Sequence, residues 1–181
     1  MCPVLQIESC HRRQESWKPG ADWKKMQSSN PNGEGKFQVR KLEISDQSKG
    51  FIEPLQQLSV CDSVSNKEFE ERFQELSSYG DDHLICVIED DLSGKIIASG
   101  SIFIEKKFLR NCGKVGHIED VVVDANERRL QLGKRVVEFL TEHAHGLGCY
   151  KVILDCGLEN KAFYEKCGFK QKEIQMVKYF I

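Results

Sequence analysis

The stretch from Gly116 to Arg135, GHIEDVVVDANERRLQLGKR, holds the residues best suited to polar chemistry. Its apolar part, residues 118–123, is typical of a strand, and an amphipathic helix is predicted to begin at Gly133. The first turn of a helix presents free backbone N–H groups, and the helix dipole favours negative charge there. A basic loop that opens a helix directly after a strand therefore predicts a phosphate-binding site.

Charged side chains surround this predicted anion site. The basic ones are Arg128, Arg129, Lys134 and Arg135. Two carboxylates, Glu119 and Asp120, are neighbours on the strand before the loop, so we expect them to point to opposite faces and not to form an acid/base pair. The residues alone leave two interpretations open: one carboxylate lines a pocket, or both are solvated charges at the end of a strand.

The loop from Arg128 to Gly133 resembles the acetyl-CoA signature of the GNAT acetyltransferase superfamily, Gln/Arg-x-x-Gly-x-Gly/Ala, with Gln131 where the middle Gly is usual. Together with the flanking segments GHIEDVVVD, CYKVILDC and FYEKCGF, it is similar to the glucosamine-6-phosphate N-acetyltransferase family, whose loop accepts Gln there. Arg129 departs from that family, in which Gly is common, and has less backbone freedom than Gly. The resemblance covers residues 36–180.

The resemblance implies a transferase with acetyl-CoA as co-substrate and no metal. It would pass the acetyl group to the amine of D-glucosamine 6-phosphate, giving N-acetyl-D-glucosamine 6-phosphate and CoA for UDP-N-acetylglucosamine biosynthesis. The amine would attack directly in a ternary complex. Two alternatives stay open: a GNAT-fold enzyme that acetylates another amine, such as a polyamine or a protein N-terminus, and a CoA-binding module without catalysis. The basic cluster at residues 106–110 favours an anionic substrate over a cationic one.

The resemblance assigns acetyl-CoA to the strand, the loop and a later short helix, with the strand backbone pairing with the pantetheine arm as an added strand would. The residues it implies are Val121, Val122, Val123, Arg129, Leu130, Gln131, Leu132, Gly133, Lys134, Tyr164, Glu165 and Lys166.

The resemblance likewise implies the binding site for the sugar phosphate and two catalytic side chains. The substrate-binding residues are Ser59, Lys107, Phe108, Leu109, Arg110, Glu119, Asp120, Val121, Asp155 and Lys178. Asp155 would hold the amine in the attacking orientation, and the phenol of Tyr164 would donate a proton to the departing sulfur. From the residues alone, Asp155 is equally a turn former and Tyr164 a half-buried core aromatic.

The periodicity predicts an α/β fold, a mixed central sheet with helices on both faces, which the resemblance specifies as the GNAT acyl-CoA acyltransferase fold. We expect a flexible N-terminal extension over residues 1–35 and one domain over residues 36–181. The expected strands are 36–44, 83–89, 96–105, 115–123, 150–155 and 174–181, with 150–155 buried on both faces. The expected helices are one capped by Asp46 or Ser48 that reaches Leu58, one capped by Asn66, then 133–147 and 160–166.

Bulk properties exclude several classes of protein. The net charge of −2, from 26 basic and 28 acidic side chains, argues against binding to nucleic acid. No apolar run approaches the ~20 residues of a transmembrane helix, and the first residues lack the apolar core of a secretory signal. The eight cysteines include no C-x-x-C pair, which predicts reduced thiols and a cytoplasmic location. Peripheral association with the endoplasmic reticulum membrane is left open.

The last predicted strand, residues 174–181, indicates an assembly. It is so apolar that an exposed edge at this position would promote aggregation. Pairing with a second copy would bury it around a two-fold axis. The resemblance implies the same arrangement, a homodimer with active sites near the interface.

Overall fold

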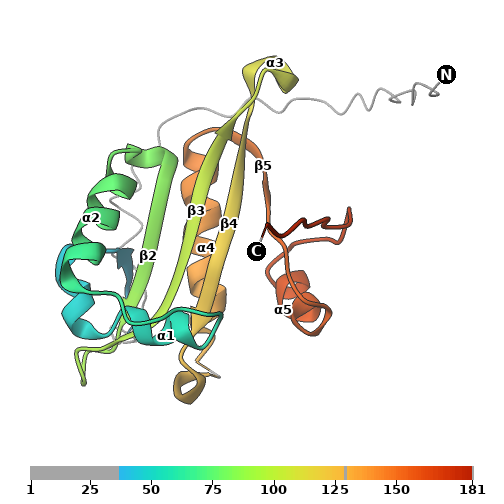
Figure 1. Ribbon diagram of the computed structural model, residues 1–181. Coiled ribbons are helices and arrows are strands. Elements are labelled where there is room, and N and C mark those ends of the chain that lie inside the picture. Colours follow the sequence, from blue (N-terminus) through green and yellow to red (C-terminus); the bar gives the residue numbers. More distant parts are fainter. Residues whose placement is uncertain (1–36, 129, 181) are drawn as a thin grey trace. The chain divides into compact units, whose positions relative to one another are not determined.

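The computed structural model describes residues 37–128 and 130–180 of the chain (Figure 1). The expected N-terminal extension lies outside these residues. Five strands form one sheet in the order β1-β2-β3-β4-β5. Their bounds are β1 Val39–Lys41, β2 His83–Glu89, β3 Ile96–Lys106, β4 Lys114–Val123 and β5 Cys149–Ile153. From β1 to β4, each strand pairs antiparallel with the next one, and β5 pairs parallel with β4. The predicted mixed sheet is confirmed.

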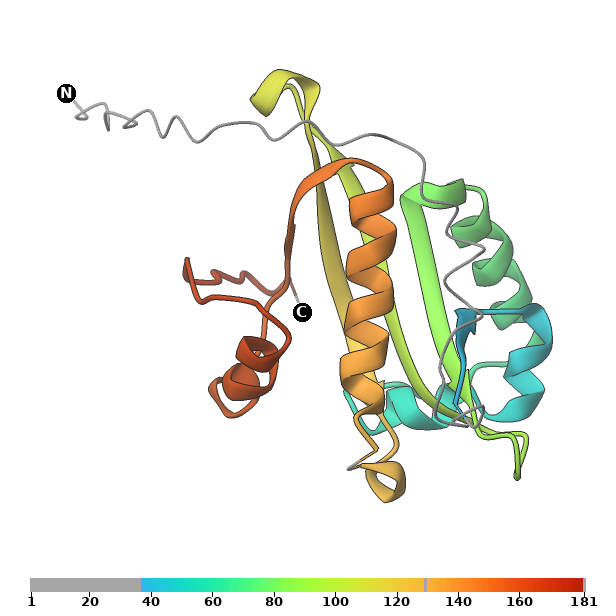
Figure 2. The ribbon, with the colours of Figure 1, turned by 180° about the vertical axis from the view of Figure 1, so that it is seen from behind.

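Helices cover both faces of this sheet, as the sequence predicts (Figures 1 and 2). The helix α4 packs on one face, and α1 and α2 lie on the other. The α-helices are α1 Ile52–Gln56, α2 Asn66–Ser77, α3 Leu109–Cys112, α4 Leu132–Gly146 and α5 Lys161–Lys166. Short 3-10 helices are η2 Ile44–Lys49, η3 Gly80–Asp82, η4 Ala125–Glu127 and η5 Leu158–Asn160.

The two cores follow from the alternation of side chains along the central strands. In β2, Cys86 and Ile88 belong to the core under α4, whereas Val87 belongs to the core with Phe51 and Phe69 on the other face. Cys86 is fully buried and behaves as the small hydrophobic residue that the sequence predicts; burial raises the pKa of its thiol to about 12.

The chain between β1 and α2 differs from the prediction. The strand expected over 36–44 is only Val39–Lys41, because Glu43 already caps η2 through a hydrogen bond between its N–H and Asp46. The single helix expected to reach Leu58 is broken at Gly50, which has φ 80°, into η2 and α1.

The helix α2 is capped one residue earlier than the sequence predicts. Asn66 is its first helical residue, and Ser65 caps it: the Ser65 hydroxyl accepts the N–H of Glu68, whose carboxylate accepts the N–H of Ser65. This reciprocal pair satisfies two backbone donors.

The last two predicted strands are also corrected. β5 ends at Ile153, so Asp155 lies beyond the strand, and Ile153 is 36% exposed instead of buried. Since β5 pairs only with β4 within the described residues, it is an edge strand and one side lacks cover. Residues 174–180 form no strand, because no strand of the described chain pairs with them; Ile181 lies outside those residues.

Candidate functional site

The predicted phosphate loop lies at the start of α4, the longest helix described. This helix has 15 residues, and Gly133 is its second. A helix of this length presents free N–H groups and a positive dipole end at its first turn. Lys134 is next to Gly133 and forms a partly exposed ion pair with Glu138 at 3.5 Å between Nζ and Oε1. The local structure therefore suits an anion such as a pyrophosphate.

The backbone conformation of Gln131 explains why a glycine is usual at this position of the loop motif. It precedes α4 with φ 57° and ψ 20°, the left-handed conformation. Glycine adopts this conformation without steric cost, whereas another L-residue pays about 1–2 kcal/mol. The glycine usual at this place in the signature thus corresponds to a left-handed backbone that Gln131 reproduces. Arg129, the other departure from the family pattern, lies outside the described residues.

The strand β4 has a bulge at Asp120, which has φ 52°. Ser99 and Ser101 of β3 pair with Val122 and Glu119 of β4, so the regular alternation stops there. Because of this bulge, the alternation of side chains along β4 no longer requires Glu119 and Asp120 to point to opposite faces. Both side chains are exposed and close enough for their charges to interact.

The same part of β4 has a free edge. The parallel pairing of β4 with β5 runs from Lys114 with Cys149 to His117 with Ile153. Beyond His117, no described strand pairs with that side of β4, so the backbone of residues 118–123 can take an extended ligand. Val121, Val122 and Val123, the predicted pantetheine contacts, lie on this edge.

Three carboxylates gather beside the free edge. Desolvation raises the pKa of Glu119, and the nearby charges of Asp120 and Asp155 raise it further, while His117 opposes them. Asp155 follows β5, and its Oδ2 accepts a hydrogen bond of 2.9 Å from Nε2 of Gln175. The structure therefore brings together the predicted residues Glu119, Asp120 and Asp155.

Tyr164 lies in α5 and is half-buried. Its ring meets Phe163 edge-on at 4.9 Å between centroids and Phe169 at 6.2 Å. Burial raises the pKa of its phenol, with smaller contributions from Cys156, Cys167 and Glu119. Within the described chain, no hydrogen bond engages the phenol oxygen, so its proton is available. Because the charge of Glu119 contributes to this raised pKa, Tyr164 lies close enough to the carboxylate cluster to interact with it electrostatically.

Other predicted residues lie apart from this cluster in the single chain. The segment 107–110 is at the tip of the β3–β4 hairpin, beyond the Lys106–Lys114 pair, and Glu119 lies five positions along the strand from Lys114, roughly 16 Å. Its Lys107 pairs with Glu105 at 2.7 Å. Ser59 follows α1, and Lys178 is exposed in the last segment, near the ring of Phe180. The predicted cofactor residues Leu130, Glu165 and Lys166 are exposed.

Two polar residues near the site were missed by the sequence prediction. Gln175 holds Asp155, and Gln57 contacts the start of the β4–α4 loop through Asp124 and Ala125. Neither stands in a motif, and their partners are 20 and at least 67 residues away along the chain. No signal in the sequence could have found them.

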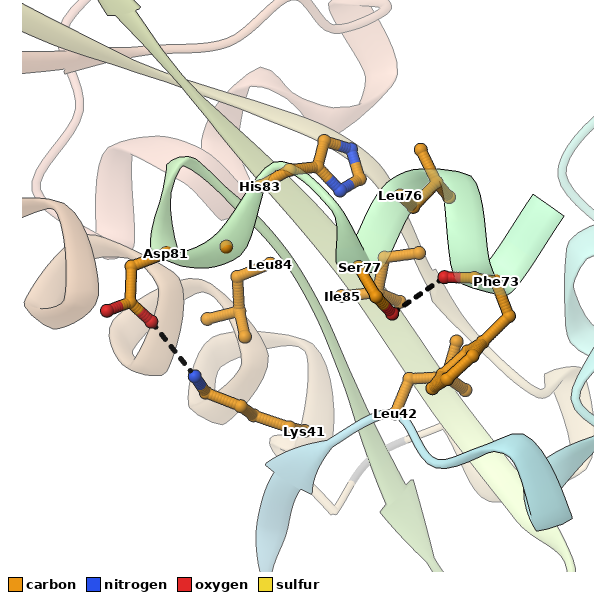
Figure 3. A pocket seen from close by; sticks show the side chains of 10 residues that line it. Lys41, Leu42, Phe73, Leu76, Ser77, Asp81, His83, Leu84 and Ile85 are labelled. Atoms are coloured by element: carbon orange, nitrogen blue, oxygen red, sulfur yellow. Dashed lines mark hydrogen bonds and ion pairs between the residues drawn. The ribbon is translucent and has the colours of Figure 1, made fainter.

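A half-open hollow of about 250 Å³ lies elsewhere, between β1, α2 and β2 (Figure 3). Its wall is mostly apolar, with Leu42, Phe73 and Leu84, and the Lys41–Asp81 ion pair at 3.2 Å lies at its side. None of the predicted site residues lines it. The candidate site is instead the strand edge, the helix start and α5.

The chain is similar to known proteins over most of its length. A model of the acetyltransferase (GNAT) family matches residues 52–169. The glucosamine 6-phosphate N-acetyltransferase of Arabidopsis thaliana is 68% identical over 144 residues, which cover 80% of this chain and 97% of that protein. Glucosamine 6-phosphate N-acetyltransferase 1 of Oryza sativa subsp. japonica is 50% identical, over 82% of this chain and 90% of that protein.

Solved structures of acetyltransferases are also similar to this chain over most of its length. The crystal structure of the Arabidopsis thaliana enzyme has a TM-score of 0.79 and covers 80% of this chain and 99% of that one, at 68% identity. An acetyltransferase from Trypanosoma brucei has a TM-score of 0.73 at 37% identity, over 80% and 99% of the two chains. Over the described residues, no helix is long and apolar enough to cross a membrane.

Proposed function

Because the chain belongs to the acetyltransferase (GNAT) family, we infer that it transfers the acetyl group of acetyl-CoA to the amine of glucosamine 6-phosphate. The observation that carries this conclusion is its 68% identity to the Arabidopsis thaliana glucosamine 6-phosphate N-acetyltransferase over 97% of that protein. The helix start and the free strand edge described above fit a ligand with a pyrophosphate and an extended amide arm. The acetyl-CoA thioester supplies the electrophilic carbonyl carbon.

The backbone around Gly133 and the side chain of Lys134 would hold the pyrophosphate at the start of α4. The edge of β4 at Val121 to Val123 would pair with the extended arm, which directs the thioester toward Glu119 and Asp120. Arg129, Leu130, Gln131, Leu132, Glu165 and Lys166 complete the proposed cofactor contacts. A bound, oriented pair of reactants can gain up to about 7–11 kcal/mol over the same groups in solution.

Asp155 and Tyr164 would act on the two sides of the reacting carbon. Asp155 accepts a hydrogen bond from the neutral amine and so aims its lone pair. As the new C–N bond forms and the C–S bond breaks, the phenol of Tyr164 gives its proton to the sulfur. Its raised pKa keeps that proton in place at neutral pH. The surplus proton on the amine passes to solvent or to a neighbouring carboxylate, the Tyr164 phenolate takes a proton back from solvent, and no acyl-enzyme is formed.

We further propose a homodimer in which residues of both chains complete each sugar site. Two observations support it: residues 174–180 are exposed and largely apolar, with Phe180 89% exposed, and the tip at 107–110 lies far from Asp155 of its own chain. A second copy whose last segment crosses over would cover the apolar residues. Ser59, Lys107 to Arg110 and Lys178 would then surround the sugar phosphate. We place the reaction in the cytoplasm and propose that it needs no metal.

Release of free CoA thiol tests the activity. The chain is incubated with acetyl-CoA and, in parallel, with glucosamine 6-phosphate, glucosamine, spermidine and a peptide with a free N-terminus. We expect fast release with the first amine alone. Equal or faster release with spermidine or the peptide would assign the chain to another amine, and no release with any amine would leave a CoA-binding module.

A further inference from the structure

Gln57 ties the end of α1 to the start of the β4–α4 loop. Its Nε2 donates to Oδ2 of Asp124 at 3.1 Å, and its Oε1 accepts the backbone N–H of Ala125 at 2.9 Å. Both polar ends of one side-chain amide are thus used by two consecutive residues. Figure 1 shows α1 lying across this end of β4.

Asp124, the partner of Gln57, also forms hydrogen bonds within the loop and to the neighbouring strand. Its Oδ1 accepts the N–H of Asn126 at 2.8 Å and so caps η4, while its own N–H donates to the carbonyl of Ile97 in β3 at 2.8 Å. The loop that leaves Asp124 ends at Gln131 and the start of α4. The hydrogen bonds from Asn126 and Gln57 lower the pKa of Asp124, so the carboxylate is ionised at neutral pH.

The chain that follows Gln57 leads to Ser59, a residue of the proposed sugar site. Ser59 lies two residues further on, in a connection without helix that reaches Ser65. This connection is largely exposed, and Val60 is 94% exposed. In contrast, α1 is held by the buried Pro54. A ligand bound at Ser59 would therefore contact the chain two residues from Gln57, on the exposed side of α1.

We propose that Gln57 is a positioning residue that couples the binding of the sugar phosphate beside α1 to the binding of CoA at the start of α4. The inference rests on the proposed function, since it needs both ligands. Coupling between two sites requires a shared element whose state both ligands favour, and the Gln57 contacts provide one. Since Gln57 is exposed, its loss should hardly change the melting temperature.

The test measures the dissociation constant of CoA by calorimetry, alone and with saturating glucosamine 6-phosphate. Without an acetyl group no turnover occurs. We expect the sugar phosphate to tighten CoA binding, and we expect Gln57→Leu to cut that tightening by roughly fivefold or more, the low end of known couplings. In turnover, the KM values should rise while kcat at saturation stays near that of the wild type.

Two further variants make the test specific. Gln56→Leu is the matched control, because it is the same change one residue earlier, where the described chain has no side-chain hydrogen bond; it should keep the wild-type coupling. Gln57→Glu sets a second carboxylate against Asp124 and should abolish coupling. Combining it with Asp124→Asn exchanges amide and carboxylate while keeping each hydrogen bond, and should restore coupling.

The proposal would be overturned if Gln57→Leu kept the wild-type coupling or if Gln56→Leu lost as much coupling as Gln57→Leu. It would also be overturned if the exchanged double variant did not recover coupling, or if the sugar phosphate did not change the CoA affinity of the wild type. Failure of the proposed function would look different, since the wild type would then release no CoA from acetyl-CoA and glucosamine 6-phosphate.

Discussion

Gly133 and Phe163 lie in direct contact across the site: a Cβ atom at residue 133 would come within 3.2 Å of Cζ of Phe163. The same Cβ would lie 3.5 Å from Val123 at the end of β4. The loop at the start of α4 therefore packs against both the strand edge and α5, the helix that carries Tyr164. A side chain added at Gly133 should therefore disturb both the proposed cofactor loop and the position of the proposed proton donor.

The first prediction is for Gly133→Val. Overpacking of a tight site costs about 1–3 kcal/mol, so we expect the KM for acetyl-CoA to rise roughly 5- to 150-fold, with a smaller loss in kcat as the added side chain displaces Phe163 and α5. The KM for glucosamine 6-phosphate should change little. Gly146→Ala is the control, because no atom lies within 4 Å of a Cβ there. An equal rise in both KM values would remove the loop from the cofactor site.

The second prediction concerns Tyr164→Phe. The change removes one hydroxyl and leaves the ring packing on Phe163 and Phe169, so acetyl-CoA binding should be retained. We expect kcat to fall by about 10²–10⁴-fold, the usual worth of a placed proton donor. Tyr150→Phe, the same change on β5, should be harmless. Wild-type turnover by Tyr164→Phe would contradict the assignment.

Tyr164 also gives a third prediction, for the pH profile. Its pKa is raised, chiefly by burial, above the ordinary tyrosine value of about 10. Because the active form carries the proton, kcat should stay level as the pH rises to that value and should fall only above it. Measured kcat between pH 7 and 11 checks this. A falling limb centred well below pH 10, absent in Tyr164→Phe, would show that the pKa of the phenol is lowered instead.

The sequence predicts much of the fold because local patterns determine it. The alternation in β2 and the 3.6-residue period of α4 are visible in the residues, and burial follows them. The bulge at Asp120 is invisible, because its left-handed φ depends on the register with β3, not on a glycine. The break at Gly50 and the cap at Ser65 compete with equally good local alternatives. The Gln57 and Gln175 contacts join distant segments, so only the folded chain reveals them.

The fourth prediction is for the ion pair between Arg40 and the buried Asp46, away from the site. Asp46 is fully buried and receives two hydrogen bonds of 2.7 Å from Arg40, whose side chain is 26% exposed, so Asp46→Ala leaves this guanidinium with Glu89 as its remaining carboxylate partner. We expect a loss of about 1.5–3 kcal/mol in the free energy of unfolding, the usual contribution of hydrogen bonds to a charged group, measured by urea denaturation, with normal KM values at low temperature. Asp62→Ala, an exposed aspartate, should change stability by less than about 0.5 kcal/mol.

This ion pair also determines a pH dependence. Burial alone would raise the pKa of Asp46, but the hydrogen bonds from Arg40 and the N–H of Glu43 lower it overall. A lowered folded-state pKa gives stability that is present above the unfolded value, about 3.9, and is lost as the pH falls through the folded one. The stability gap between the wild type and Asp46→Ala should thus narrow below about pH 4. A gap that stays constant to pH 2 would exclude the carboxylate as its source.

The last prediction concerns the segment after α5. Residues 174–180 expose Ile174, Met176 and Phe180, each more than four-fifths exposed, while Gln175 between them holds Asp155. If a second copy covers the apolar residues, deleting 174–181 should abolish both the dimer and the activity. Because the deletion also frees Asp155, the double variant Met176→Glu, Phe180→Glu tests assembly with Gln175 kept. Light scattering should then report one chain, 20.8 kDa, instead of twice that mass. Gln175→Leu should remain a dimer and lose part of kcat/KM for the amine. A deletion or charged variant that stays a dimer would show that this segment does not join the subunits, and a fully active monomer would show that the second chain does not complete the site.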